Sequence, residues 1–280
     1  MKSIVVVGAY GGMGRATVLK LVENGYEVYA LDKIVKEKED HIHPIICDVT
    51  NIDSINEAYE LVHKETDDIY AIIHFVGIYY LDSLIEITKE KYENIYKINV
   101  FGPYLINKTF LPLLKKGSRI IITTSELATL DPLPFTGLYA ITKGALDKYS
   151  YSLAMELALL DINVSVIRPG AVKTEMLNVS TNELDEFCNN LWKNREKIQK
   201  GTYKWNNSEY NAYSYESKIC FLINPEYYKL IYDGNVRKAL NKATKDNWQD
   251  KADKYYQNNN NKEKIPFEID WTLWLEGSKK

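Results

Sequence analysis

The chain has 280 residues, of which 45% are hydrophobic and 26% charged, as is typical of a folded globular protein. Its net charge of -3 offers no basic excess to bind a phosphate backbone, so we expect no nucleic acid among its partners. Three scattered cysteines without CxxC spacing favour neither a disulfide framework nor a metal site, and no apolar run approaches the ~20 residues that span a membrane.

Short apolar stretches alternate with helical patterns along most of the chain. Strands are predicted at 4–7, 27–31, 44–47, 69–75, 119–123 and 163–167, with a further strand at 228–232. Helices are predicted at 15–23, 52–64, 89–114 and 138–160, with a further helix at 236–245. Because strands that are apolar throughout are covered on both faces, and because they alternate with helices, the pattern predicts an α/β fold with a doubly wound parallel sheet.

A glycine-rich turn joins the first predicted strand to the first predicted helix. Glycine reaches positive φ without strain and lets a pyrophosphate approach the backbone, while the helix N-terminus directs N–H groups at the phosphates. A plain strand-to-helix turn is the alternative, but this position between a strand and a helix favours dinucleotide binding. The residues expected at the phosphates are Gly8, Gly12, Met13 and Gly14.

Asp32 ends the second predicted strand. A carboxylate there accepts from both hydroxyls of an adenosine ribose and repels a 2′-phosphate, which favours NAD over NADP, although Lys33 and Arg15 can blunt that preference. Asp48, after the third strand, can accept from the adenine amino group, with Val49 as a further candidate contact. An Asx turn before the next helix explains Asp48 about equally well.

Tyr139 and Lys143 lie four residues apart, so a phenol and an ammonium share one helix face. A free phenol has a pKa near ~10, and a nearby ammonium together with an oxidised nicotinamide ring favours the phenolate. Tyr139 can then take a proton from a substrate hydroxyl, and in the reverse direction it donates one. The YxxxK pattern alone arises often by chance, so its surroundings decide its meaning.

Those surroundings resemble the short-chain dehydrogenase/reductase family from Lys2 to about Met176, with the glycine turn, Ser125 and the Tyr139–Lys143 pair in the family's order. The resemblance implies a Rossmann fold and an NAD(P)-dependent oxidoreductase that acts on CH–OH groups. It also implies that Ser125 hydrogen-bonds the substrate oxygen and that Asn99 holds a water in the proton relay. The loop after the sixth strand is expected to bind the nicotinamide through Pro169, Gly170, Val172 and Thr174.

One segment departs from the family pattern. After the fourth strand the family commonly has Asn-Asn-Ala-Gly, whereas this chain has His74-Phe75-Val76-Gly77. We expect the backbone at Gly77 to pass beside the cofactor ribose as it does in the family. We also expect His74 to replace the missing asparagine by bracing the sheet with a hydrogen bond, which we favour over a catalytic histidine.

The segment at about 177–215 is dense in aromatic residues and is predicted to be a substrate lid. Its rings can line a pocket for a steroid-like or long-chain alcohol or ketone, although rings that pack on the protein itself are about equally expected. Some steroid- and retinol-type members resemble the chain at 99–103. We predict one domain over 1–245, which includes the lid, and a C-terminal extension over 246–280.

An alcohol dehydrogenase or carbonyl reductase is the favoured function. The alternatives are a regulatory protein that binds a nicotinamide cofactor without turnover, and a lyase or epimerase that uses hydride transiently. The intact Ser125, Tyr139 and Lys143 favour the enzyme. We expect a cytoplasmic protein and, because family members dimerise through two long helices, a homodimer or homotetramer.

Overall fold

The computed structural model describes residues 1–80, 82, 84, 87–130, 136–170, 172, 174–176, 203–205 and 208–210. The chain divides into two compact units: the first comprises 1–80, 89–130 and 138–177, and the second comprises 81–88, 131–137 and 178–280. The described part of the second unit includes one antiparallel pair, β7 (Tyr203–Trp205) with β8 (Ser208–Tyr210), inside the predicted lid. The strand expected at 228–232, the helix at 236–245 and the extension at 246–280 lie outside the described residues.

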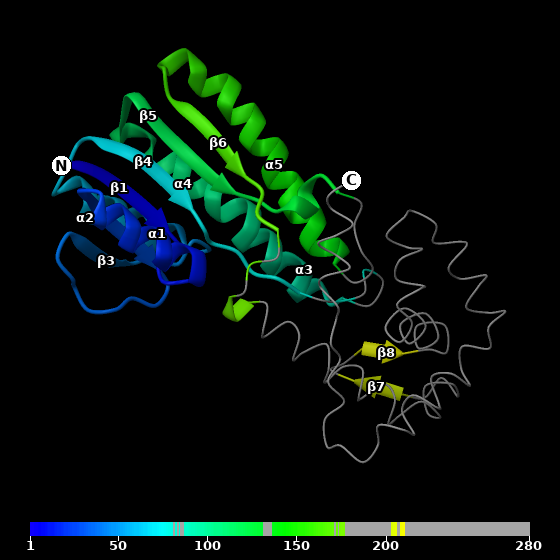
Figure 1. The fold of residues 1–280 in the computed structure, drawn as a ribbon. Helices are drawn as coiled ribbons and strands as arrows, with labels where there is room; N and C mark the ends of the chain where they lie inside the picture. Colours follow the sequence, from blue (N-terminus) through cyan, green and yellow to red (C-terminus); the bar gives the residue numbers. More distant parts are fainter. Residues whose placement is uncertain are drawn as a thin grey trace. The chain divides into compact units, whose positions relative to one another are not determined.

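Six parallel strands form the sheet of the first unit, in the order β3-β2-β1-β4-β5-β6 (Figure 1). They are β1 (Lys2–Val7), β2 (Tyr26–Asp32), β3 (Ile42–Ile46), β4 (Ile69–His74), β5 (Leu114–Thr123) and β6 (Asn163–Ile167). The chain winds from β1 out to β3 and then returns to the other side of β1 with β4. The winding therefore reverses between β1 and β4, where ligands bind in such sheets. The predicted Rossmann fold is confirmed.

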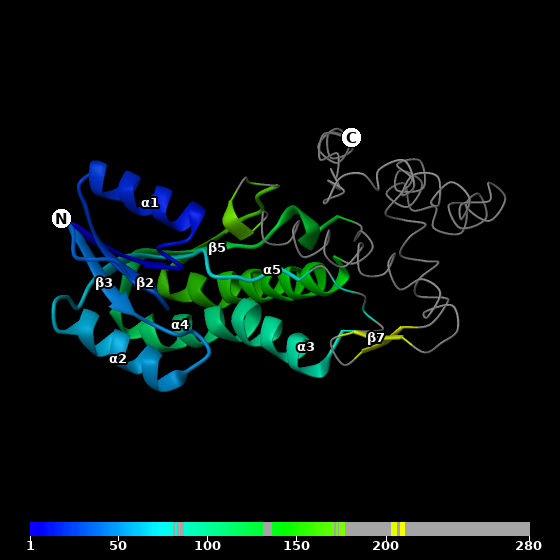
Figure 2. The same ribbon diagram turned by 90° about the horizontal axis from the view of Figure 1, so that it is seen from below.

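Helices lie on both faces of this sheet (Figure 2), and its central strands β1 and β4 are buried over most of their length. Helix α1 (Gly12–Glu23) lies on one face, and α2 (Ile52–His63), α4 (Gly102–Phe110) and α5 (Gly137–Leu157) lie on the other. Along β1, Ile4 and Val6 join the hydrophobic layer under α1, whereas Val5 and Val7 join the layer under the other three helices. Alternate side chains of one strand thus fill two separate cores.

The segment predicted as one helix over 89–114 is helical without a gap from Lys89 to Leu113, but it is not a regular α-helix. It consists of α3 (Lys89–Tyr96), a π-helical turn (Lys97–Phe101), α4 and a 3-10 turn (Leu111–Leu113). Pro103 in the first turn of α4 has no N–H to donate to the carbonyl of Asn99, and the N–H of Gly102 bonds to Lys97 instead. The predicted helix is confirmed up to Leu113, with a π-helical turn where the proline interrupts the regular hydrogen-bond ladder, and Leu114 already begins β5.

The helix predicted over 138–160 ends earlier than expected. α5 stops at Leu157, and a 3-10 turn over Ala158–Leu160 leads to Asp161 at φ 53°. This tightening turns Leu160 out of the predicted buried stripe and leaves it 54% exposed. Neither α5 nor any other helix in the described part of the chain is long and apolar enough to cross a membrane.

His74, at the end of β4, braces the layer under α4 and α5. Its Nε2 lies 2.7 Å from Oδ1 of Asn107 in α4, and Nδ2 of Asn107 donates to the hydroxyl of Tyr149 in α5 at 3.2 Å. These bonds confirm the predicted bracing role. Burial lowers the pKa of His74 to about 4, so the imidazole is neutral at physiological pH.

We expect the free energy of unfolding to fall by up to roughly 3 kcal/mol as the pH is lowered from 6.5 towards 4. In this window the unfolded histidine binds a proton that buried His74 does not, so stability is lost on acidification. Urea unfolding of wild type and His74→Gln at several pH values measures this. His63→Gln removes an exposed histidine and is the matched control. Parallel pH profiles for wild type and His74→Gln would contradict the assignment.

Candidate active site

The glycine turn packs three backbone segments together at the carboxyl end of β1. Gly8 has φ 79°, and its N–H donates to the carbonyl of Leu31 at 2.8 Å. A Cβ on Gly8 would lie 2.7 Å from the backbone nitrogen of Val76, and a Cβ on Gly14 would overlap the carbonyl oxygen of Gly8. Both glycines are therefore required by close backbone contact.

The N-terminus of α1 starts at this turn without a side-chain cap. Gly11 is the N-cap residue and contributes no capping hydrogen bond from a side chain, so the N–H groups at Gly12, Met13 and Gly14 meet no capping side chain. A Cβ on Gly12 would lie 2.8 Å from Cγ2 of Thr174, which brings the loop after β6 to the same place. An uncapped helix start beside two loops suits a phosphate group.

Asp32 stands next to the glycine turn. Its carboxylate accepts the N–H of Tyr10 and the N–H of Lys33, each at 2.8 Å. Asp48 accepts the N–H of Thr50 at 2.9 Å and its hydroxyl at 2.7 Å, and the hydroxyl bond contributes most to lowering the pKa of Asp48. These are the bonds of an Asx turn, and the contact of Asp48 with adenine stays a prediction.

Three residues predicted for proton transfer meet beyond β5. Tyr139 and Lys143 face inward from α5, and Ser125 follows β5 and caps a 3-10 turn by accepting the N–H of Leu127 at 3.2 Å. The hydroxyl of Ser125 acts to lower the pKa of the Tyr139 phenol, as a nearby hydrogen-bonding group does. The Nζ of Lys143 donates to the carbonyl of Thr123 at 3.2 Å and lies 5.7 Å from the centre of the Tyr139 ring.

Burial controls the protonation of this group. It raises the pKa of Tyr139 to about 12, against the lowering effect of the Ser125 hydrogen bond. It also lowers the pKa of Lys143 to about 8. The prediction that the ammonium together with an oxidised nicotinamide ring favours the phenolate concerns the protein with bound cofactor, and it stays a prediction. In the protein alone burial is the largest effect on the phenol, and Nζ of Lys143 points to the carbonyl of Thr123, so Tyr139 holds its proton at neutral pH.

The π-helical turn presents Asn99 to the same group. Asn99 donates from Nδ2 to the carbonyl of Ile78 at 2.9 Å and to Oγ1 of Thr142 at 3.1 Å, and its Oδ1 accepts the N–H of Ile78 at 2.8 Å. A Cβ on Gly77 would lie 3.2 Å from Nζ of Lys143 and 3.4 Å from Oδ1 of Asn99. Gly77 thus leaves room for both polar groups. A water on Asn99 stays a prediction, with Oδ1 as its remaining acceptor.

The loop after β6 is joined to the segment that carries Ser125. The carbonyl of Pro169 accepts the N–H of Glu126 at 3.1 Å, and a Cβ on Gly170 would lie 3.2 Å from Oε1 of Glu126. Within the described part of the chain this Oε1 is buried without a hydrogen-bond partner, and burial raises the pKa of Glu126. Glu126 was not predicted as a site residue from the sequence, although it directly follows Ser125.

Two predicted cofactor contacts are not brought to the polar group. Val49 belongs to the core, where a Cβ on Gly102 would lie 2.8 Å from its Cγ2. Val172 is 43% exposed. For both residues a cofactor contact stays a prediction, and any role for Val49 falls to its backbone.

Other contacts that hold the site escaped the sequence reasoning. Nε and Nη2 of Arg168 donate to the carboxylate of Asp147 at 2.8 and 3.0 Å, which fastens the end of β6 to α5. The ring of Tyr79 meets the ring of Tyr139 edge to face, with centroids 4.7 Å apart. No motif marks such pairs, because they join segments far apart in the chain.

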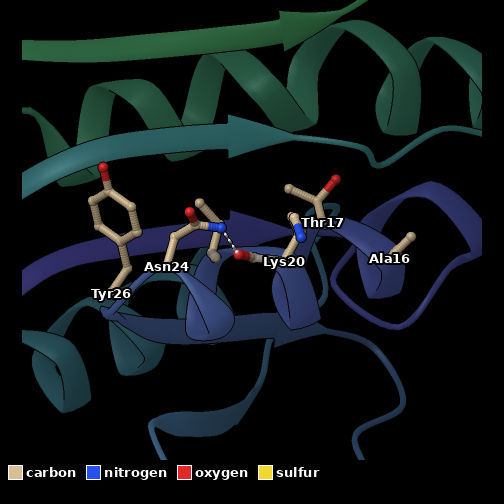
Figure 3. A pocket seen from close by; sticks show the side chains of 6 residues that line it. Ala16, Thr17, Lys20, Asn24 and Tyr26 are labelled. Carbon is tan, nitrogen blue, oxygen red and sulfur yellow. Dashed lines mark hydrogen bonds between the residues drawn. The ribbon is translucent and has the colours of Figure 1, made fainter.

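A shallow hollow of about 570 Å³ lies along α1 (Figure 3). It is lined by Ala16, Thr17, Lys20, Leu21, Asn24 and Tyr26. None of these side chains is buried, and Nδ2 of Asn24 is already bonded to the carbonyl of Lys20 at 2.7 Å. Tyr26 begins β2, so the hollow extends towards the amino ends of the strands, and it contains none of the predicted site residues.

The family model described as short chain dehydrogenase matches residues 2–185. The chain belongs to the short-chain dehydrogenase family. This match spans the whole sheet and every predicted site residue, so the order of motifs and the topology agree on the family.

Among similar proteins, estradiol 17-beta-dehydrogenase 2 from Mus musculus is 30% identical over 187 residues, which cover 62% of this chain and 49% of that one. The chain therefore spans about half the length of this relative. A 3-ketodihydrosphingosine reductase from Bacteroides thetaiotaomicron is 28% identical over 203 residues, covering 70% and 76%. The crystal structure of a short-chain dehydrogenase from Burkholderia cenocepacia in complex with NADP matches with TM-score 0.56 and 27% identity, covering 63% and 76%.

We expect Gly14→Ala to lower the free energy of unfolding by about 1–3 kcal/mol or more, because the added methyl overlaps a backbone carbonyl that cannot move freely. Gly11→Ala is the control in the same turn, since its φ is -71° and its nearest neighbour is 3.6 Å away. Urea unfolding measures both variants. Equal stability of the two would show that close packing does not explain Gly14.

Proposed function

We propose that this protein is a nicotinamide-dependent oxidoreductase that interconverts a secondary alcohol and a ketone. The observation that carries the proposal is the convergence of Ser125, which follows β5, with Tyr139 and Lys143 of α5. This arrangement supports a site in which a proton donor and a second hydrogen-bonding hydroxyl would meet one substrate oxygen.

The chain's residues fit a dinucleotide at the reversal point of the sheet. The uncapped start of α1 at Gly12, Met13 and Gly14 would hold the phosphates, and Asp32 the adenosine ribose. Gly77 and the loop from Pro169 to Thr174 would border the nicotinamide end. When bound, the cofactor supplies or accepts the hydride, and the protein orients it.

Tyr139 would move the proton. Because burial keeps its phenol protonated, Tyr139 is ready to donate to a carbonyl oxygen that becomes an alkoxide, and Ser125 donates a hydrogen bond to the same oxygen. In the oxidative direction Tyr139 accepts the alcohol proton. Lys143 and Asn99 flank Gly77 and would return protons towards solvent.

We propose NAD as the preferred cofactor. The carboxylate of Asp32 lies beside the glycine turn, where the adenosine ribose would bind, and a 2′-phosphate at that point would meet its negative charge. The similar Burkholderia protein was crystallised with NADP, so relatives include members with the other preference. For this chain, Asp32 supports NAD as the preferred cofactor.

A hydrophobic alcohol or ketone is the proposed substrate class. Two of the relatives are named for estradiol and for 3-ketodihydrosphingosine, both largely apolar molecules. The aromatic segment at 177–215 supports this class by its composition.

We also propose a homodimer or homotetramer that forms through the long helices. Apolar side chains are exposed on the π-helical turn, on α4 and on α5, among them Phe101, Tyr104, Tyr151 and Met155. Surfaces of this kind are typical of protein–protein contacts.

We expect Tyr139→Phe to lose at least about 100-fold in turnover while it keeps its affinity for the cofactor, because the substitution removes only the hydroxyl group that carries the transferable proton. Hydroxysteroids, retinoids, simple alcohols and their ketones form the assay panel, read by the absorbance of the reduced cofactor. Cofactor affinity is measured separately by titration. Turnover near the wild-type rate in Tyr139→Phe would contradict the role of Tyr139. Cofactor binding without turnover across the panel would favour the regulatory protein.

We expect Asp32→Ala to weaken the binding of NAD by about tenfold and that of NADP less, because the hydrogen bonds to the ribose hydroxyls are lost together with the repulsion of a phosphate. Calorimetric titration with each cofactor measures the two dissociation constants. An equal loss for both cofactors would remove Asp32 from the ribose site.

A further inference from the structure

We propose that Glu39 makes the adenosine end of this site selective for NAD by engaging Arg15, the cation best placed to meet a 2′-phosphate. The inference rests on the proposed function, since it assigns a selectivity residue to the same cofactor site. Glu39 lies in the connection between β2 and β3, outside every motif of the sequence.

Arg15, Tyr10 and Asp32 form one continuous group at the glycine turn. Nη2 of Arg15 lies 2.6 and 2.8 Å from the two carboxylate oxygens of Glu39. The guanidinium lies over the ring of Tyr10, with 5.8 Å between its carbon and the ring centre. The N–H of Tyr10 in turn donates to Asp32 at 2.8 Å. Arg15 therefore contacts Tyr10, and Tyr10 bonds directly to the carboxylate that would meet the ribose.

The two cations nearest this ribose position are already paired with carboxylates. Arg15 is paired with Glu39, and the ammonium of Lys33 lies 3.1 Å from a carboxylate oxygen of Asp48. The bonds that Asp32 accepts within the described part of the chain come from backbone N–H groups. A phosphate dianion on the ribose would therefore meet the negative charge of Asp32 while both cations are engaged elsewhere.

Of the two cations, Arg15 is the one that Glu39 withholds from a phosphate. Its side chain is 22% exposed, whereas that of Lys33 is 75% exposed and well solvated. Nη1 of Arg15 is buried and has no hydrogen-bond partner in the described part of the chain, so the guanidinium keeps an unused donor. Without the carboxylate of Glu39, Nη2 of Arg15 is released for a phosphate, which guanidinium groups bind strongly.

Glu39→Gln tests this assignment, with Glu37→Gln as the control. Glu37 is exposed in the same connection and loses the same charge. We expect Glu39→Gln to lower the dissociation constant of NADP by about fivefold to tenfold, a modest gain because the ion pair is partly exposed. The dissociation constant of NAD should stay within about twofold. Calorimetric titration with NAD, NADP and 2′,5′-ADP measures these values without turnover.

Arg15→Gln in the Glu39→Gln background should abolish the gain, because the released guanidinium is its cause. The proposal is overturned if Glu37→Gln gives the same gain, if the gain survives without Arg15, or if Glu39→Gln leaves NADP binding unchanged. Each of these results leaves the proposed function standing, because the wild type still binds a cofactor. Wild-type protein that binds neither NAD nor NADP overturns the proposed function and this assignment together.

Discussion

The close contact of Gly8, Gly14 and the backbone at Val76 is the constraint on which the site depends. It lets the end of β1, the start of α1 and the segment after β4 pack directly against each other through their backbones. A side chain on either glycine would push these segments apart. Gly77 follows Val76 in the chain and lies beside Lys143. The contact therefore also positions the polar group around Tyr139 relative to the uncapped start of α1.

A second constraint acts through Pro103. Its missing N–H leaves the carbonyl of Asn99 without its helical partner, and the chain adopts a π-helical turn. That turn directs Asn99 between Ile78 and Thr142. A residue that would lie on the surface of a regular helix thereby becomes part of the bracing between β4 and α5.

Burial then sets the charge state of the polar groups. Tyr139 and His74 are kept neutral and the pKa of Lys143 falls towards neutrality, all for the same reason: the charged forms lose their hydration. The protein alone is thus prepared to give a proton from Tyr139. Around the adenosine end the arrangement is different, since Arg15 with Glu39 and Lys33 with Asp48 form ion pairs that are partly exposed.

The sequence by itself determined the strands and helices of the sheet and the spacing of Tyr139 and Lys143, because apolar periodicity and short-range spacing are local properties. Ser125 was expected from the order of motifs that the chain shares with the family. The sequence did not determine the partners of Asn99, Glu39 and Glu126, or the burial that raises the pKa of Tyr139. These features depend on which segments pack against each other and on how deeply they are buried, and only the tertiary structure decides that.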